Sequence, residues 1–178
     1  DDFYTKNGCE VLYNETAIRI YDENKTVVLS KGSTIPFSEL CVAAGSSPFV
    51  PSFDGLDSVK NRFSFMTLDD TFALEKAISP ESRVLIIGAG LIGLKCAEGL
   101  HNRVKSITVC DLADKILSSI LDEDTAPIVQ KFLEMHGVAF CLSDSVAQLD
   151  RDKAIMKSGR VIDFDILVTA VGVRANTA

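Results

Sequence analysis

Three glycines at fixed spacing are the residues whose chemistry is easiest to infer. They belong to a segment that runs Gly88, Ala89, Gly90, Leu91, Ile92, Gly93. The segment follows the apolar run of residues 83–87 and opens a helical pattern. In such a strand–loop–helix unit the first glycine permits a tight turn, the second lets the backbone approach a pyrophosphate, and the third lets the helix pack on the strand. The N–H groups at the helix start bind phosphate, so the motif predicts a dinucleotide-binding loop.

An acidic residue lies where such a loop requires one. Asp111 ends the next apolar run, residues 106–110, and follows Gly88 by 23 positions. A carboxylate there accepts hydrogen bonds from the adenosine ribose and repels a 2′-phosphate. Because the next residue is Leu112 rather than an arginine, the sequence favours NAD(H) over NADP(H). Lys115 is close enough in sequence to reach a phosphate, although a solvated surface lysine is the simpler interpretation.

Further along the chain, Gly172 ends the apolar run of residues 166–171. That position falls at the carboxyl edge of the predicted sheet, where a residue without Cβ lets a nicotinamide approach the backbone; a simple turn glycine is the equal alternative. His101 and His136 lack metal-ligand spacing and lie at helix ends. Residues 122–124, all acidic, are interpreted as a helix start rather than a cation site. We expect no metal site and no catalytic side chain in this chain.

Composition narrows the class of protein. The chain has 178 residues, 47% of them apolar, enough for one or two small domains. Its net charge of −7 argues against nucleic acid or an anionic membrane as partner. No apolar run reaches the roughly 18 residues of a membrane span, and the start does not have the pattern of a secretory signal.

Cysteine usage suggests a reducing, cytoplasmic compartment. The five cysteines are odd in number and form no C-x-x-C pair, so neither a disulfide framework nor a zinc site is expected. Cys41, Cys110 and Cys141 lie in strand-like runs, and Cys96 lies on a helix. We interpret all four as small buried hydrophobic residues.

The order of the predicted elements determines the predicted fold class. Strands are predicted at residues 10–13, 17–21, 26–30 and 40–44, followed by a helix at residues 68–78 that Thr67 or Asp69 caps. From residue 83 strands and helices alternate, with strands at 84–87, 106–110, 138–141, 146–149, 154–157 and 166–171, and helices at 91–102 and about 124–137. The order predicts an α/β fold, a Rossmann-like parallel sheet with an antiparallel β-meander.

Two segments of the chain, residues 7–48 and residues 136–175, follow one plan. Gly45 follows Gly32 by 13 positions, and Gly172 follows Gly159 by 13. Each segment is predicted to contain a strand, an antiparallel meander and a buried strand that ends at glycine. Because a βαβ unit precedes the second copy, we expect one before the first as well. The first copy is therefore interpreted as an incomplete remnant of a second nucleotide-binding domain.

At the glycine loop, Asp111 and the two strand–glycine endings, the sequence resembles the FAD-dependent pyridine nucleotide-disulfide oxidoreductase family. The most similar branch contains NADH oxidases, coenzyme A-disulfide reductases, rubredoxin reductases and nitrite reductase NAD(P)H subunits. Residues 40–48 resemble the flavin-domain segment A-T-G-S-x-P, with Ala44 in place of Thr and Gly45 at the glycine. Residues 51–56 resemble the linker into the NAD domain. Residues 167–176 resemble the segment that closes that domain.

This resemblance implies a division of the chain and a set of cofactors. Residues 1–80 would be the remnant of an FAD-binding domain with its linker helix, and residues 81–178 the NAD(H)-binding domain. Ala44 and Gly45 would contact FAD in the full-length parent. Lys95 lies where many members have a Glu near the nicotinamide, and Leu91 where some have a gating Tyr. These departures favour the nitrite-reductase or rubredoxin-reductase type, although Lys95 is equally well explained as an exposed helix lysine.

The resemblance implies a function for the parent protein. The parent would be an FAD-dependent NADH oxidoreductase that passes hydride from NADH to flavin and on to a disulfide, oxygen or a redox-protein acceptor. The chain itself would bind NADH without catalysing its oxidation. The alternative is a non-catalytic NADH-binding sensor or interaction module. Neither the terminal acceptor nor the oligomeric state follows from the sequence.

Overall fold

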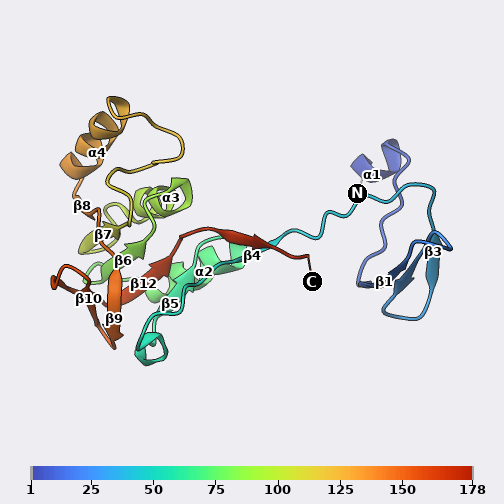
Figure 1. Ribbon diagram of the computed structural model, residues 1–178, viewed down its shortest axis with the longest axis horizontal. Helices are drawn as coiled ribbons and strands as arrows, with labels where there is room; N and C mark the ends of the chain where they lie inside the picture. Colours follow the sequence, from blue (N-terminus) through green and yellow to red (C-terminus); the bar gives the residue numbers. More distant parts are fainter. Residues whose placement is uncertain (1, 178) are drawn as a thin grey trace. The chain divides into compact units, whose positions relative to one another are not determined.

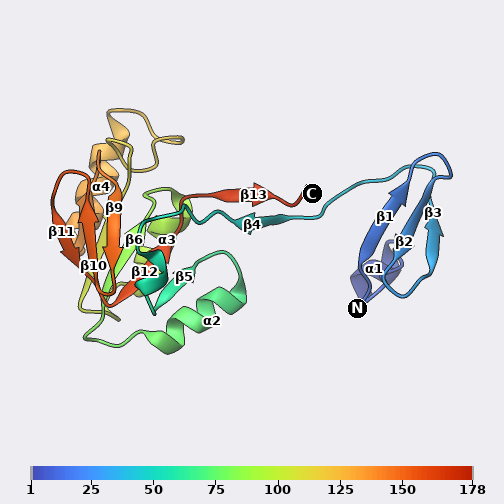
Figure 2. The ribbon, with the colours of Figure 1, turned by 60° about the horizontal axis from the view of Figure 1, so that its bottom comes forward.

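The computed structural model describes residues 2–177, which form two compact units that divide between Ala44 and Gly45. Figures 1 and 2 show the elements of both units. The first unit contains α1 (Asp2–Lys6), β1 (Ala17–Tyr21), β2 (Thr26–Leu29) and β3 (Thr34–Pro36). Its three strands form an antiparallel sheet in the order β1-β2-β3.

Two predicted strands of the first unit are wrong. Residues 10–13 form no strand, and residues 40–44, predicted to be a buried strand, belong to no sheet. Cys41 and Val42 within the second run are exposed. Strand propensity reports how well a side chain suits a pleated, half-buried surface, but it does not provide a neighbouring strand for hydrogen bonding. Among the described residues these two runs have no such neighbour.

The second unit contains the glycine loop and most of the regular structure. Its elements are β4 (Ser46–Pro48), the 3₁₀ helix η1 (Leu56–Ser58), β5 (Arg62–Ser64), α2 (Leu68–Ala77), β6 (Arg83–Ile87), α3 (Leu91–Leu100), β7 (Ser106–Cys110), α4 (Thr125–Met135), β8 (Val138–Cys141), β9 (Val146–Asp150), β10 (Lys153–Met156), β11 (Val161–Asp163), β12 (Ile166–Thr169) and β13 (Val173–Ala175).

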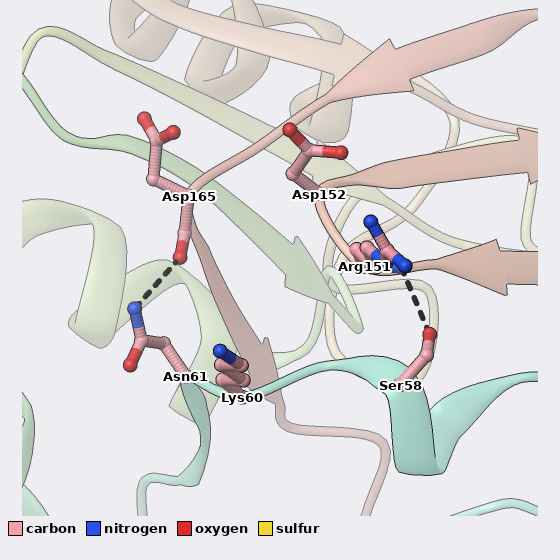
Figure 3. Close-up of a pocket in the computed structure, with 6 residues that line it drawn as sticks. All are labelled: Ser58, Lys60, Asn61, Arg151, Asp152 and Asp165. Atoms are coloured by element: carbon pink, nitrogen blue, oxygen red, sulfur yellow. Dashed lines mark hydrogen bonds between the residues drawn. The ribbon is translucent and has the colours of Figure 1, made fainter.

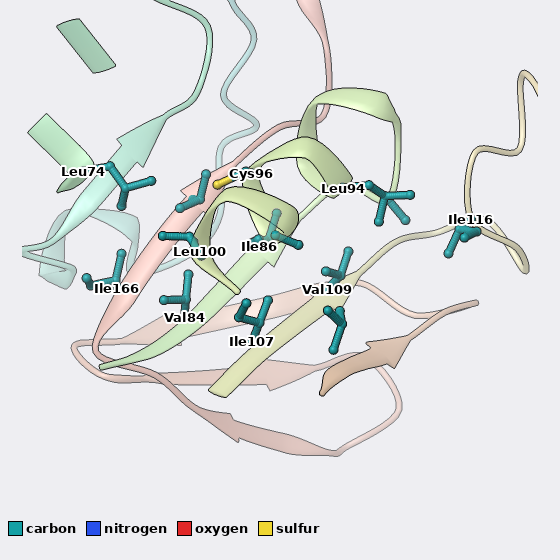
Figure 4. Close-up of a cluster of buried hydrophobic side chains, with 14 of the residues drawn as sticks. Leu74, Val84, Ile86, Leu94, Cys96, Leu100, Ile107, Val109, Ile116 and Ile166 are labelled. Atoms are coloured by element: carbon teal, nitrogen blue, oxygen red, sulfur yellow. The ribbon is translucent and has the colours of Figure 1, made fainter. Parts of the chain in front are cut away.

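A five-stranded parallel sheet in the order β5-β12-β6-β7-β8 lies at the centre of this unit. Successive residues of β6 point to opposite faces, as the period of two requires. Val84 and Ile86 pack with residues of the helices, as Figure 4 shows, whereas Leu85 and Ile87 pack with residues of β9, β10 and β11. The unit therefore has three layers: helices, parallel sheet and antiparallel meander. The predicted α/β class is confirmed.

Local signals explain where the helices begin. The Thr67 hydroxyl accepts a hydrogen bond from the Asp70 N–H at 3.1 Å, and the Asp70 carboxylate accepts one from the Thr67 N–H at 2.9 Å. This reciprocal capping box starts α2 at the predicted residue. Helix α4 begins at Thr125, which places Pro127 in its first turn, where a missing N–H costs nothing. No helix in residues 2–177 is both long and apolar enough to cross a membrane.

The boundary between the two compact units differs from the predicted one after residue 80. Residues 45–80 join the unit that contains the glycine loop. Strand β5 pairs in parallel with β12, and Leu74 of α2 is 2% exposed in the helix-side core. Residues 57–80, which follow the linker-like segment 51–56, thus contribute an edge strand and a core side chain to this unit, and burial ties them to the sheet.

The internal repeat is confirmed for its central part only. Strands β1, β2 and β3 form one antiparallel meander, and β9, β10 and β11 form another. In the second copy β8 precedes the meander and β12 follows it, both within the parallel sheet. The corresponding runs of the first copy form no strand among the described residues. The two copies therefore share the meander but differ in the strands around it.

Candidate dinucleotide-binding site

The first glycine of the loop lies between three strands. Gly88 follows β6 directly with φ +114°, a conformation that residues with a side chain rarely adopt. A Cβ at this position would lie 2.4 Å from the carbonyl oxygen of Ala170, which follows β12. The Gly88 N–H donates to the carbonyl of Cys110 at the end of β7. Only glycine fits this space, as the sequence predicted.

The other two glycines differ in the space around them: one is tightly packed and the other is open. A Cβ on Gly93 would lie 1.9 Å from the Gly88 carbonyl oxygen, so the first turn of α3 packs directly on the loop. A Cβ on Gly90 would meet no atom within 4 Å. Gly90 is the N-cap of α3, and no side chain among the described residues caps that helix start. The start of α3 thus lacks a side-chain cap and has open space beside Gly90, an arrangement suited to a phosphate.

Asp111 connects the loop to the end of β7. One carboxylate oxygen, Oδ2, accepts a hydrogen bond from the Ala89 N–H at 2.6 Å, and Oδ1 accepts one from the Ala113 N–H at 2.9 Å. Each carboxylate oxygen can accept a second hydrogen bond, so both remain able to bind a ligand hydroxyl. The predicted ribose ligand thus also holds the glycine loop in place, which the sequence did not reveal.

Two hollows meet at the glycine loop, on the carboxyl edge of the parallel sheet. The larger is about 750 Å³, and its lining includes Gly88, Gly90, Asp111, Leu112 and Val146. The smaller is about 480 Å³, and its lining includes Phe65, Met66, Gly90, Leu91, Ile92 and Gly172. Gly90, Ala170 and Val171 line both. The loop therefore separates a compartment that contains Asp111 from an apolar compartment that contains Gly172.

Gly172 and Gly45 begin two strands that pair with each other. Gly172 has φ +131°, and its carbonyl accepts a hydrogen bond from the Phe49 N–H at 2.9 Å. Gly45 has φ +71°, and its carbonyl accepts one from the Asn176 N–H at 3.0 Å. The strands that follow them, β13 and β4, are antiparallel partners. Gly45 lines neither hollow, and Ala44 ends the first compact unit.

The two lysines considered from the sequence are both engaged by carboxylates. Lys95 is exposed on α3 and forms an ion pair with Glu98 of the same helix, in neither hollow. Lys115 pairs with Glu123, and the hydrogen bond between them raises the pKa of Lys115. Neither lysine lines either hollow. The interpretation of Lys95 as an exposed helix lysine agrees with this geometry.

The cysteines differ in burial, and the two histidines lie at helix ends. Cys96, Cys110 and Cys141 are buried as predicted, whereas Cys41 is exposed, contrary to prediction. Burial raises the pKa of the Cys96 and Cys110 thiols to about 12, so neither is a thiolate at neutral pH. His101 and His136 end α3 and α4 as predicted. Residues 2–177 contain no group of three His, Cys, Asp or Glu side chains that could hold a metal ion.

Several lining residues were missed by the sequence analysis. Val146, Ser118 and Ser119 line the larger hollow, and Phe65 and Met66 line the smaller. They come from loops and strand starts at the carboxyl edge of the sheet. Only Val146 could have been identified from the sequence. It lies directly after the loop that follows β8, and ligands of such folds bind at the carboxyl edge of the sheet.

A further hollow of about 750 Å³ lies at the opposite, amino edge of the sheet (Figure 3). The Asn61 side chain donates to the Asp165 carbonyl at 3.3 Å, and the Arg151 N–H donates to the Ser58 hydroxyl at 2.8 Å. These bonds tie the start of β5 to the start of β12, and η1 to the turn between β9 and β10. The hollow is polar and separate from the glycine loop.

Comparison with known proteins places the chain among related sequences. Residues 3–178 match the family model described as pyridine nucleotide-disulphide oxidoreductase. The chain is 33% identical over 180 residues to nitrite reductase [NAD(P)H] of Bacillus subtilis (strain 168), covering 99% of this chain and 22% of the relative. It is 31% identical over 185 residues to NADH oxidase of Methanocaldococcus jannaschii, covering 99% of this chain and 41% of the relative.

A solved structure shares the fold. The water-forming NADH oxidase from Lactobacillus brevis, bound to NADH, superposes with a TM-score of 0.81 at 24% identity, covering 97% of this chain and 40% of that one. The chain thus spans well under half the length of these relatives. Because the family model matches nearly the whole sequence, the chain belongs to the pyridine nucleotide-disulphide oxidoreductase family.

Proposed function

We propose that this chain is the NAD(H)-binding portion of an FAD-dependent oxidoreductase. In the whole protein, hydride would pass from NADH to the flavin and on to a disulfide, oxygen or a redox-protein acceptor. The observation that carries the proposal is the meeting of two hollows at Gly90, beside the uncapped start of α3. A dinucleotide has the matching form, because two nucleoside halves extend from one pyrophosphate.

Each half of the cofactor is assigned to one hollow. The pyrophosphate would bind the N–H groups at the start of α3, where Gly90 leaves room for the backbone to approach it. The adenosine ribose would donate hydrogen bonds to Asp111 in the larger hollow. The nicotinamide half would lie in the smaller hollow against Gly172, among Leu91, Ile92 and Met66. These apolar residues would exclude water from the face of the ring.

The flavin belongs to the parent protein in this proposal. When bound, FAD supplies the two-electron chemistry, and the residues of this chain bind and orient the electron donor. Ala44 and Gly45 are proposed to contact FAD. No side chain at either hollow is assigned a catalytic role, because the raised pKa of Cys110 keeps the one thiol of the larger hollow protonated.

We also propose a cytoplasmic location and a redox-protein acceptor for the parent protein. The five cysteines are all free thiols, which agrees with a reducing compartment. The redox-protein acceptor is suggested by the similarity to the assimilatory nitrate reductase electron transfer subunit of Bacillus subtilis (strain 168), which is 31% identical over 179 residues.

Calorimetric titration of the chain with NADH and NADPH tests the proposed site. We expect NADH to bind with a Kd between micromolar and millimolar, and more tightly than NADPH. Asp111→Ala should weaken NADH binding about tenfold or more, because it removes charge-assisted hydrogen bonds, and should reduce the preference for NADH. Asp114→Ala is the control, since it removes the same charge outside both hollows. A folded chain that binds neither nucleotide would refute the proposal; an unchanged preference in Asp111→Ala would exclude Asp111 as the ribose ligand.

A further inference from the structure

One cation lines the larger hollow without a partner. Lys157 follows β10, and it is the only Lys or Arg among the residues that line this hollow. Within residues 2–177 its ammonium forms no ion pair and no hydrogen bond with a side chain. Two carboxylates, Asp111 and Asp144, line the same hollow.

Those carboxylates already have other partners. Asp111 accepts hydrogen bonds from the Ala89 and Ala113 N–H groups. Asp144 accepts hydrogen bonds from the Ser145 N–H at 2.8 Å and from the Ser158 hydroxyl. Both carboxylates are therefore held in place by backbone and hydroxyl donors, and within residues 2–177 neither forms an ion pair with Lys157.

The backbone at Lys157 is held in place although its side chain is exposed. The Lys157 N–H donates to the Ser145 carbonyl at 2.8 Å, and Ser145 also lines the hollow. The Asp144 carboxylate holds the turn that follows Lys157 through the Ser158 hydroxyl. The wall is therefore ordered, while the ammonium remains able to move toward a ligand in the hollow.

We propose that Lys157 is a specificity-determining residue of the cofactor site, and that its ammonium attracts the 2′-phosphate of NADPH. This inference rests on the proposed function. NADPH differs from NADH only by that phosphate, on the ribose assigned to Asp111. The Asp111 carboxylate disfavours the phosphate, and Lys157 offsets part of this repulsion. Lys115, the cation nearer in sequence, is paired with Glu123. The site thus prefers NADH while retaining measurable affinity for NADPH.

Binding measurements on charge variants of the full chain test this role. A cation about 8 Å from a phosphate with two negative charges changes affinity about fivefold in a largely aqueous setting. Lys157→Met should therefore weaken NADPH binding about fivefold and change NADH binding by less than about twofold. Lys157→Arg keeps the positive charge and should therefore bind NADPH with about the wild-type affinity. The difference between the NADPH affinities of the wild type and Lys157→Met should shrink between about 50 mM and about 300 mM NaCl.

Lys153→Met is the matched control, because Lys153 is exposed on β10, the strand that Lys157 follows, and lies outside the hollow. It should leave the affinities for both nucleotides unchanged. An unchanged NADH/NADPH ratio in Lys157→Met, or an equal loss for both nucleotides, would overturn the role of Lys157 while the proposed function stands. A folded wild-type chain that does not bind NADH would overturn both proposals.

Discussion

Replacing the first two glycines of the loop one at a time should have different effects. Gly88→Ala should lower the stability of the fold, whereas Gly90→Ala should weaken NADH binding. Gly88→Ala places a Cβ at φ +114° and only 2.4 Å from the Ala170 carbonyl oxygen. The backbone strain costs about 1–3 kcal/mol, and the overpacking costs a further 1–3 kcal/mol or so. We therefore expect the free energy of unfolding to fall by about 4 kcal/mol. That is a large part of the roughly 5–15 kcal/mol that stabilises a typical domain.

Gly90→Ala makes the same chemical change with the opposite expected result. Gly90 has φ −77°, which alanine adopts without strain, and a Cβ there meets no atom within 4 Å. The free energy of unfolding should stay within about 1 kcal/mol of the wild-type value. The added methyl would occupy the space assigned to the pyrophosphate, so NADH affinity should fall at least about tenfold.

Urea unfolding followed by circular dichroism measures the first effect, and calorimetric titration with NADH measures the second. In a protein of this size a loss of about 4 kcal/mol lowers Tm by about 12 °C. The reasoning fails if Gly88→Ala unfolds at the wild-type urea midpoint. It also fails if Gly90→Ala loses as much stability as Gly88→Ala, or if it binds NADH with wild-type affinity.

Two further predictions concern the stability of the second unit. Asp165→Asn should lower the free energy of unfolding by about 1 kcal/mol at neutral pH, a value reduced by solvent screening of this partly exposed pair. The hydrogen bond from Arg83 lowers the pKa of Asp165 to about 2 from 3.8. The stabilisation by Asp165 is therefore complete above pH 4 or so and should disappear as the pH falls to about 2. Urea unfolding of the wild type and Asp165→Asn across this range measures it, and a stability difference that persists in acid would contradict the reasoning. Leu74→Ala should cost about 2–4 kcal/mol, because the side chain is 2% exposed, whereas Leu68→Ala, 67% exposed on the same helix, should cost less than about 0.5 kcal/mol. Equal unfolding midpoints for these two variants would show that α2 does not stabilise the unit.

Some predictions from sequence succeeded because their causes are local. The positive φ at Gly88, the capping box at Thr67 and the position of Pro127 each depend on a few neighbouring residues. The alternation of strands and helices from residue 83 is also local, because it follows from the periods of the two structures. The failures at residues 10–13 and 40–44 have the opposite origin. Their side chains favour a strand, but no described segment pairs with them.

The sequence alone determined the glycine loop, the acid that faces it and the α/β class, because backbone conformation and hydrophobic period depend on residues that are close in sequence. Only the tertiary structure decided which distant segments become neighbours. It brought β5 to β12, Asp111 to the Ala89 N–H, and Lys157 to the hollow that contains Asp111. Such contacts depend on packing and sheet pairing across long stretches of chain, and no short pattern encodes them.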